Sequence, residues 1–178
     1  MAKKAFIMGL IVSLAACGMV AAETVDTNRL IEKSGRVKVY ISGVTNNSGQ
    51  AEITADGFRK VLESSINNRR SIKFEIVPDA AASDFRIAAV IKKYAYSKTD
   101  PINSVAGPSA LLLDAVTTEN YAEMSVDFTV TSTKTGKAVW KENVSDYVEH
   151  TMTPEESIPL VYDKTARRFL WKAFGKGK

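Results

Sequence analysis

Cysteine and histidine are scarce in this chain: Cys17 and His150 are the only examples among 178 residues. A single cysteine excludes an intramolecular disulfide, and a zinc site draws on several His or Cys ligands. No G-x-S-x-G elbow is present to supply the serine of a catalytic triad. The glycines are scattered, without the G-x-x-x-x-G-K-[ST] spacing of a phosphate loop. These absences predict a protein that is not an enzyme and that holds no metal and no cofactor.

A hydrophobic run long enough to cross a membrane is also missing. The N-terminal apolar stretch from Ala5 to Ala16 has twelve residues, whereas a membrane-spanning helix needs about 20. Lys3 and Lys4 precede this stretch, and small residues end it, as in an export signal. The sequence therefore predicts a signal peptide over residues 1–16.

The four residues Leu14-Ala15-Ala16-Cys17 resemble the bacterial lipobox. In proteins with that motif the cysteine thiol receives a diacylglycerol, the chain is cut before the cysteine, and the new amine is acylated. The resemblance implies lipidation of Cys17 with palmitate-type chains, and residues 17–35 then form a lipidated tether. Gly18 implies sorting to the outer membrane, with the protein facing the periplasm, because the inner-membrane retention signal is Asp at that position.

A second cleavage site competes with the lipobox. Val20-Ala21-Ala22 before Glu23 suits the ordinary secretory peptidase, which would discard Cys17 and release a soluble periplasmic protein. A buried core thiol is a third interpretation of Cys17, but a lone cysteine inside an export signal is poorly placed for it. Both cleavage sites put the mature chain outside the cytoplasm.

Excess charge of one sign is small. The full chain carries a net charge of +4, and without Lys3 and Lys4 the balance is 22 basic against 20 acidic residues. Nucleic acid is therefore not an expected partner. Three basic pairs remain, and they are Arg69-Arg70, Lys92-Lys93 and Arg167-Arg168. Because arginine forks match phosphate geometry, we consider Arg69, Arg70, Lys92 and Lys93 candidate contacts for an anionic lipid or glycan.

Alternating apolar residues predict the strands, and helical spacing predicts two helices. The expected strands cover residues 36–44, 72–76, 84–96, 121–132 and 138–148. The order predicts an α+β two-layer sandwich, with a largely antiparallel four- to five-stranded sheet and two main helices on one face. Removal of residues 1–16 leaves 162 residues, which fit a single domain over 36–174 with a basic tail at 175–178.

Local signals mark the starts of both helices. Thr54 is the expected N-cap of a helix that ends near Asn67. Thr153, followed by Pro154 and by Glu156 at the third helical position, predicts a capping box. Pro159 is expected to delay or kink this second helix.

The longest connection, from Ser97 to Asn120, turns apolar after a polar start. Leu111, Leu112 and Leu113 lie within it. Long loops in compact domains are often functional, and an apolar loop needs a surface to cover it. We consider the three leucines candidate partner contacts; the alternative is a short helix that caps the core.

Three segments together resemble bacterial outer-membrane accessory lipoproteins. Residues 39–48 (VYISGVTNNS) are similar to their opening strand and turn, residues 82–87 (ASDFRI) to a strand start, and residues 133–140 (TKTGKAVW) to a hairpin that ends in tryptophan. Asn46-Asn47-Ser48 favours the lipoprotein activators of penicillin-binding proteins and their curli-secretion relatives. The helix after Trp140 favours the LPS-assembly lipoprotein. Thr133, where the hairpin commonly has Asp, and the apolar insertion at 97–120 depart from both branches.

This resemblance implies a non-catalytic accessory or assembly factor of cell-envelope biogenesis. Its partner would be a barrel translocon in LPS transport or a peptidoglycan synthase, with LPS itself as a further candidate ligand. A soluble or anchored periplasmic binding module for lipid or glycan is the alternative. The same hairpin pattern predicts that Trp140 packs on the sheet beside the C-terminal helix.

Overall fold

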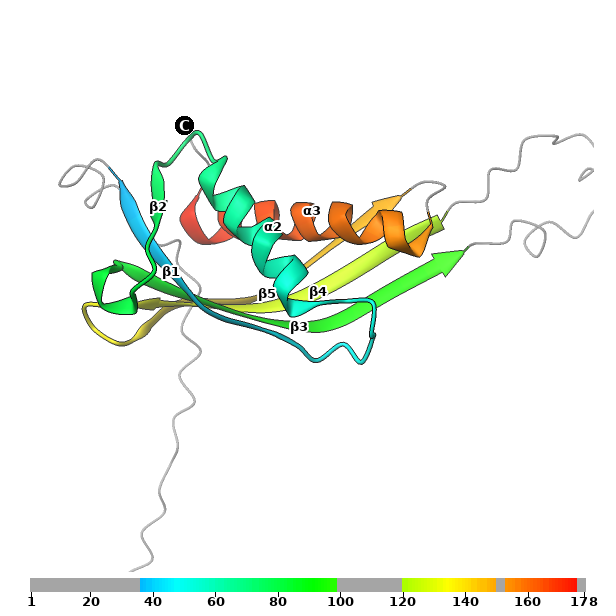
Figure 1. Ribbon diagram of the computed structural model, residues 1–178, viewed down its shortest axis with the longest axis horizontal. Coiled ribbons are helices and arrows are strands. Elements are labelled where there is room, and N and C mark those ends of the chain that lie inside the picture. Colours follow the sequence, from blue (N-terminus) through cyan, green and yellow to red (C-terminus); the bar gives the residue numbers. More distant parts are fainter. Residues whose placement is uncertain (1–35, 99–119, 150–152, 176–178) are drawn as a thin grey trace, which may run out of the picture.

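The computed structural model describes residues 36–98, 120–149 and 153–175, which form one five-stranded sheet and two helices (Figure 1). Both helices cover the same face of the sheet, which confirms the predicted α+β class. A one-turn 3₁₀ helix, Ala80–Ala82, lies between the second and third strands. The elements are β1 (Val37–Asn46), α2 (Ala55–Asn67), β2 (Phe74–Ile76), β3 (Phe85–Lys98), β4 (Asn120–Ser132), β5 (Ala138–Glu149) and α3 (Pro154–Phe174).

The sheet is mixed, which refines the expectation of a largely antiparallel one. The strand order is β2-β1-β3-β4-β5; β1 pairs in parallel with β2 and β3, and only β3-β4 and β4-β5 are antiparallel. Helix α2 returns the chain to the starting end of β1, so β2 must run parallel to it. Val39 pairs with both Ile76 and Phe85. Because β2 ends at the level where β3 begins, a short connection places β3 parallel on the other side of β1.

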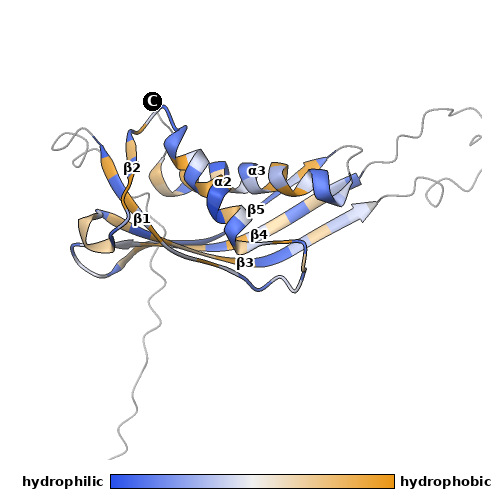
Figure 2. Cartoon of the chain, in the orientation of Figure 1, coloured by the Kyte–Doolittle hydropathy of each residue, from blue (hydrophilic) through white to orange (hydrophobic). Residues whose placement is uncertain are grey.

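The core lies between the helices and the inner face of the sheet, where apolar side chains recur along each element (Figure 2). Phe128 of β4 stacks on Phe169 of α3, with ring centroids 4.0 Å apart and planes 6° apart. Trp140 lies 5.5 Å from Phe169 and is only 2% exposed. The predicted packing of Trp140 beside the C-terminal helix is therefore confirmed.

Both predicted helix starts are confirmed. The Thr54 side chain accepts a hydrogen bond from the Gly57 amide, and Thr153 forms the full capping box with Glu156. Pro159 lies inside α3 without ending it. A proline in a helix removes the hydrogen bond that its own nitrogen would donate to the carbonyl four residues earlier. Since Pro159 and the Glu155 it would have bonded are exposed, water can satisfy that carbonyl.

Tyr162 of α3 ties the two helices together. Its hydroxyl accepts from the Thr54 amide at 3.0 Å and donates to the Thr54 carbonyl at 3.3 Å, and burial raises the pKa of Tyr162. We expect Tyr162→Phe to lower the free energy of unfolding by about 1 kcal/mol at neutral pH.

The same variant should respond differently to alkali. Because the folded-state pKa of Tyr162 lies above the unfolded value, its contribution is complete below about pH 10 and is lost as the pH rises through the folded-state pKa. Urea unfolding at about pH 7 and about pH 11 should therefore show the difference between wild type and Tyr162→Phe shrinking in alkali. An equal difference at both pH values would contradict this assignment.

Candidate functional site

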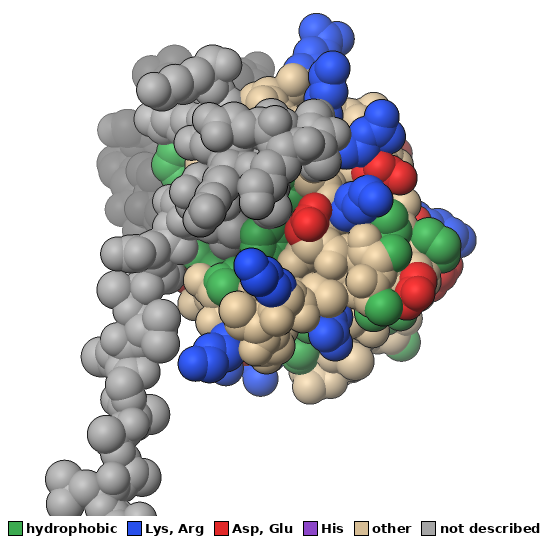
Figure 3. Space-filling model, turned by 90° about the vertical axis from the view of Figure 1, so that its left-hand side faces the viewer, with side chains coloured by type: hydrophobic (Ala, Val, Ile, Leu, Met, Phe, Trp, Pro, Cys, Tyr) green, Lys and Arg blue, Asp and Glu red, His purple; other side chains and the backbone are tan. Residues whose placement is uncertain are grey.

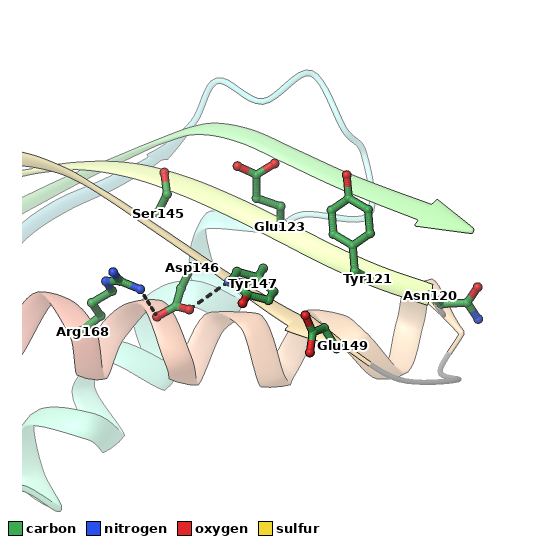
Figure 4. A pocket seen from close by; sticks show the side chains of 8 residues that line it. All are labelled: Asn120, Tyr121, Glu123, Ser145, Asp146, Tyr147, Glu149 and Arg168. Atoms are coloured by element: carbon green, nitrogen blue, oxygen red, sulfur yellow. Dashed lines mark hydrogen bonds and ion pairs between the residues drawn. The ribbon is translucent and has the colours of Figure 1, made fainter. Parts of the chain in front are cut away.

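A cleft of about 490 Å³ lies where β4 begins and β5 ends (Figure 4). Its volume is within the range of small-ligand and side-chain sites. Three elements contribute to it: two neighbouring antiparallel strands and helix α3. Its lining residues are Asn120, Tyr121, Glu123, Ser145, Asp146, Tyr147, Glu149 and Arg168.

Two tyrosines and two glutamates alternate across the strands at this cleft. The register sets Tyr121 opposite Glu149 and Glu123 opposite Tyr147. Their neighbours Ala122 and Met124 face the core, so by strand alternation these four side chains belong to the sheet face that the helices leave uncovered. Tyr121 is 39% exposed and Tyr147 is 48% exposed. The cleft thus presents aromatic surface next to carboxylates.

Asp146 lies on the opposite side of β5 and holds α3 against this strand. Its side chain is 8% exposed and faces Arg168 Nη1 at 3.3 Å and Lys164 Nζ at 3.9 Å. Figure 4 shows the Asp146–Arg168 contact below the strands, while Tyr121 and Glu123 extend above them. One turn further along α3, Lys172 pairs with Glu142 of β5. Acidic residues of an edge strand and basic residues of α3 therefore form a row of ion pairs.

The backbone of the edge strand is also occupied at this point. The Tyr147 amide donates to Asp146 Oδ1 at 2.9 Å, and Lys164 Nζ donates to the Tyr147 carbonyl at 2.7 Å. An edge strand ordinarily offers such groups to an added strand. At Tyr147 side chains of this chain already satisfy both groups, so this part of the edge is protected against strand addition.

The basic residues predicted as an anionic-ligand contact are not brought together. Arg69 lies in a groove between α2 and α3, where it donates to Ser71 Oγ at 3.2 Å and to the Gly175 carbonyl, and burial lowers its pKa. Arg70 follows it on the exposed loop. Lys93 instead lies on the uncovered sheet face. Binding of an anion at these residues remains a prediction.

The surface and the remaining basic pairs give no continuous positive patch. At the end of the molecule seen in Figure 3, Lys and Arg side chains are spread singly and interspersed with acidic ones. Lys93 forms an ion pair with Glu123 at 2.7 Å, and this hydrogen bond raises the pKa of Lys93, while Lys92 is exposed. Arg167 pairs with Asp163 at 2.9 Å, on a different side of α3 from Arg168.

Several sequence-predicted residues lie outside the described ranges. These are Cys17, Leu111, Leu112, Leu113 and His150. Lipidation and the contact role of the leucines therefore stay predictions. Within the described residues, no helix has the length and hydrophobicity to span a membrane, and no group of three His, Cys, Asp or Glu side chains is placed to hold a metal ion.

Sequence reasoning missed the tyrosines of the cleft, although a signal was present. Tyr-x-Glu occurs twice, at Tyr121-Ala122-Glu123 and at Tyr147-Val148-Glu149. Each copy on its own is ordinary strand alternation. Only the antiparallel register, which superposes the two copies in opposite directions, brings both rings and both carboxylates into one cleft.

Comparison with known proteins identifies the fold but no family. No protein-family model and no curated protein sequence matches this chain. Protein CT253 from Chlamydia trachomatis is similar in structure, with a TM-score of 0.52 and 9% identity over 76% of this chain and 94% of that one. A point variant of the PelC dodecamer from Paraburkholderia phytofirmans aligns with a TM-score of 0.50 and 11% identity over 79% of this chain and 89% of that one. At such identities the likeness is one of fold alone.

Proposed function

We propose that this chain is a bacterial lipoprotein anchored to the periplasmic face of the outer membrane, where it acts without catalysis as an accessory factor of envelope biogenesis. The observation that carries the proposal is Leu14-Ala15-Ala16-Cys17 behind a basic and then apolar N-terminus. The partner is an envelope protein, either a barrel translocon for LPS or a peptidoglycan synthase.

The described surface supports binding more than chemistry. Acid–base catalysis needs titratable groups that converge on a substrate. On the uncovered face, Glu123 is paired with Lys93, and Asp127 accepts a hydrogen bond from Asn143 at 2.7 Å. These carboxylates have structural partners. What the same face leaves exposed is the aromatic surface of Tyr121 and Tyr147, which suits a contact site.

A binding module for glycan or lipid is the second candidate, and the cleft favours its glycan form. Exposed rings bordered by Asn120, Ser145 and carboxylates combine apolar surface with hydrogen-bonding groups. Sugars present the same two kinds of surface. Saturable binding of a neutral oligosaccharide at the cleft, without a protein partner, would support this second candidate over the first.

The anchor is tested by Cys17→Ala. We expect the variant to lose all labelling by a fatty-acid probe and to move from the membrane fraction to the soluble or precursor fraction, because only the thiol can accept the diacylglycerol. Cys17→Ser is the matched control for polarity and should behave like Cys17→Ala. Membrane retention and labelling of both variants would contradict the proposal.

The partner is tested by cross-linking in intact cells. The full chain, tagged at its C-terminus, is purified from cross-linked membranes and its covalent partners are identified by mass spectrometry. Recovery of a barrel translocon or of a peptidoglycan synthase decides between the two branches. Recovery of neither, from a chain shown to be lipidated, would contradict an accessory role in these pathways.

A further inference from the structure

The charges that line the cleft are not fully compensated. Asp146 is neutralised by Arg168, and Glu123 is neutralised by Lys93. Glu149 is exposed and makes no hydrogen bond or ion pair with any residue in the described ranges. The cleft therefore retains one carboxylate that is available to a cationic group.

The ring next to that carboxylate is available too. Tyr121 is the cross-strand neighbour of Glu149 and is 39% exposed. Cross-strand side chains lie about 5 Å apart at their Cβ atoms, so one ligand group can touch both. A cation over an aromatic face, with a carboxylate beside it, gains from both contacts.

The cleft already contains one example of this arrangement. Lys164 Nζ lies 5.1 Å from the centroid of the Tyr147 ring and 3.9 Å from Asp146. The Tyr121–Glu149 pair repeats the same combination of ring and carboxylate, but without a cation among the described residues. The geometry thus provides one filled and one open cation position in a single cleft.

We propose that the open position binds an arginine side chain of the protein partner, with the guanidinium stacked on Tyr121 and paired with Glu149; this rests on the proposed function. Arginine fits better than lysine because its planar guanidinium can lie flat on a ring while its edge donates two hydrogen bonds to a carboxylate. Because the edge of β5 is closed at Tyr147, the partner contributes a side chain here and does not add a strand.

The test is a titration of the full chain in detergent micelles, with ring-labelled tyrosine observed by NMR. The probe is acetyl-Gly-Arg-Gly-amide, and the matched neutral probe is its citrulline analogue. Of the six tyrosines, only Tyr121 and Tyr147, assigned by Tyr→Phe variants, should shift saturably. We expect binding of the citrulline peptide to be about tenfold weaker, in keeping with loss of a cation–π contact and an ion pair.

Two variants locate the site. Glu149→Gln should weaken the arginine peptide about fivefold, whereas Glu52→Gln, an exposed glutamate outside the cleft, should leave its affinity unchanged. Equal affinity for both peptides, absence of a saturable shift, or stronger binding of chitobiose than of the arginine peptide would each overturn the proposal. Both variants keep an uncharged side chain of the same shape at an exposed site, so folding is not in question.

A second measurement separates this proposal from the proposed function. If the cross-linked partner is recovered equally by wild type and by Glu149→Gln with Tyr121→Ala, the accessory role stands and the arginine site is wrong. If both the peptide and the partner depend on these residues, the cleft is the partner contact.

Discussion

Trp140→Ala is expected to lower the free energy of unfolding by about 4 kcal/mol, since large-to-small changes of buried aromatic residues cost about 3–5 kcal/mol. Trp140 is 2% exposed and packs on Phe169, which in turn stacks on Phe128. Its removal leaves a cavity where β5 meets α3, and the rigid neighbours cannot close it. For a chain of this size the melting temperature should fall by roughly 10 °C.

The chain offers its own control for this prediction. Trp171 lies on α3 and is 49% exposed, so Trp171→Ala should cost about 1 kcal/mol or less. Thermal unfolding followed by far-UV circular dichroism measures both variants under the same conditions. Equal losses for the two tryptophans would show that the packing between β5 and α3 does not carry the stability assigned to it.

Asp146→Ala is expected to cost about 2 kcal/mol and to expose the edge of the sheet. The carboxylate holds Arg168 and Lys164 and accepts from the Tyr147 amide. Breaking a fully buried ion pair costs about 3–5 kcal/mol, but both cations are half exposed and can be solvated, so the loss is smaller. The freed amide then lies on an open strand edge, which favours association with a second chain.

Analytical ultracentrifugation and thermal unfolding together test this second prediction. Asp146→Ala should melt about 5 °C lower and associate with increasing concentration. Asp127→Asn, on the other face of the neighbouring strand, should change neither property by much. A variant of Asp146 that melts within about 1 °C of wild type and sediments identically would show that the ion-pair row is dispensable.

Local patterns along the chain predicted the elements well. The alternation from Ala122 to Val130 and the capping box at Thr153 are physical signals contained in short segments, and both elements form as expected. The burial of Trp140 followed from the same hairpin. These features depend on neighbours in sequence, so a single sequence contains the information.

Features that depend on distant pairings were less accessible. The parallel pairing of β1 with β2 and β3 arises from where the connections cross, which alternation does not encode. The separation of Arg69 from Lys93 by the thickness of the sheet was hidden for the same reason. Likewise, Tyr121 and Glu149 are ordinary strand residues until the register sets them opposite one another.

The anchor at Cys17 is the premise on which localisation, partner and mode of action all depend. Intact-mass analysis of the mature chain, extracted from membranes with detergent, tests it most directly. The expected mass is that of residues 17–178 plus a diacylglyceryl group and one further acyl chain, with all added mass on the N-terminal cysteine fragment. An unmodified chain beginning at Glu23, recovered without detergent, would contradict the lipoprotein assignment.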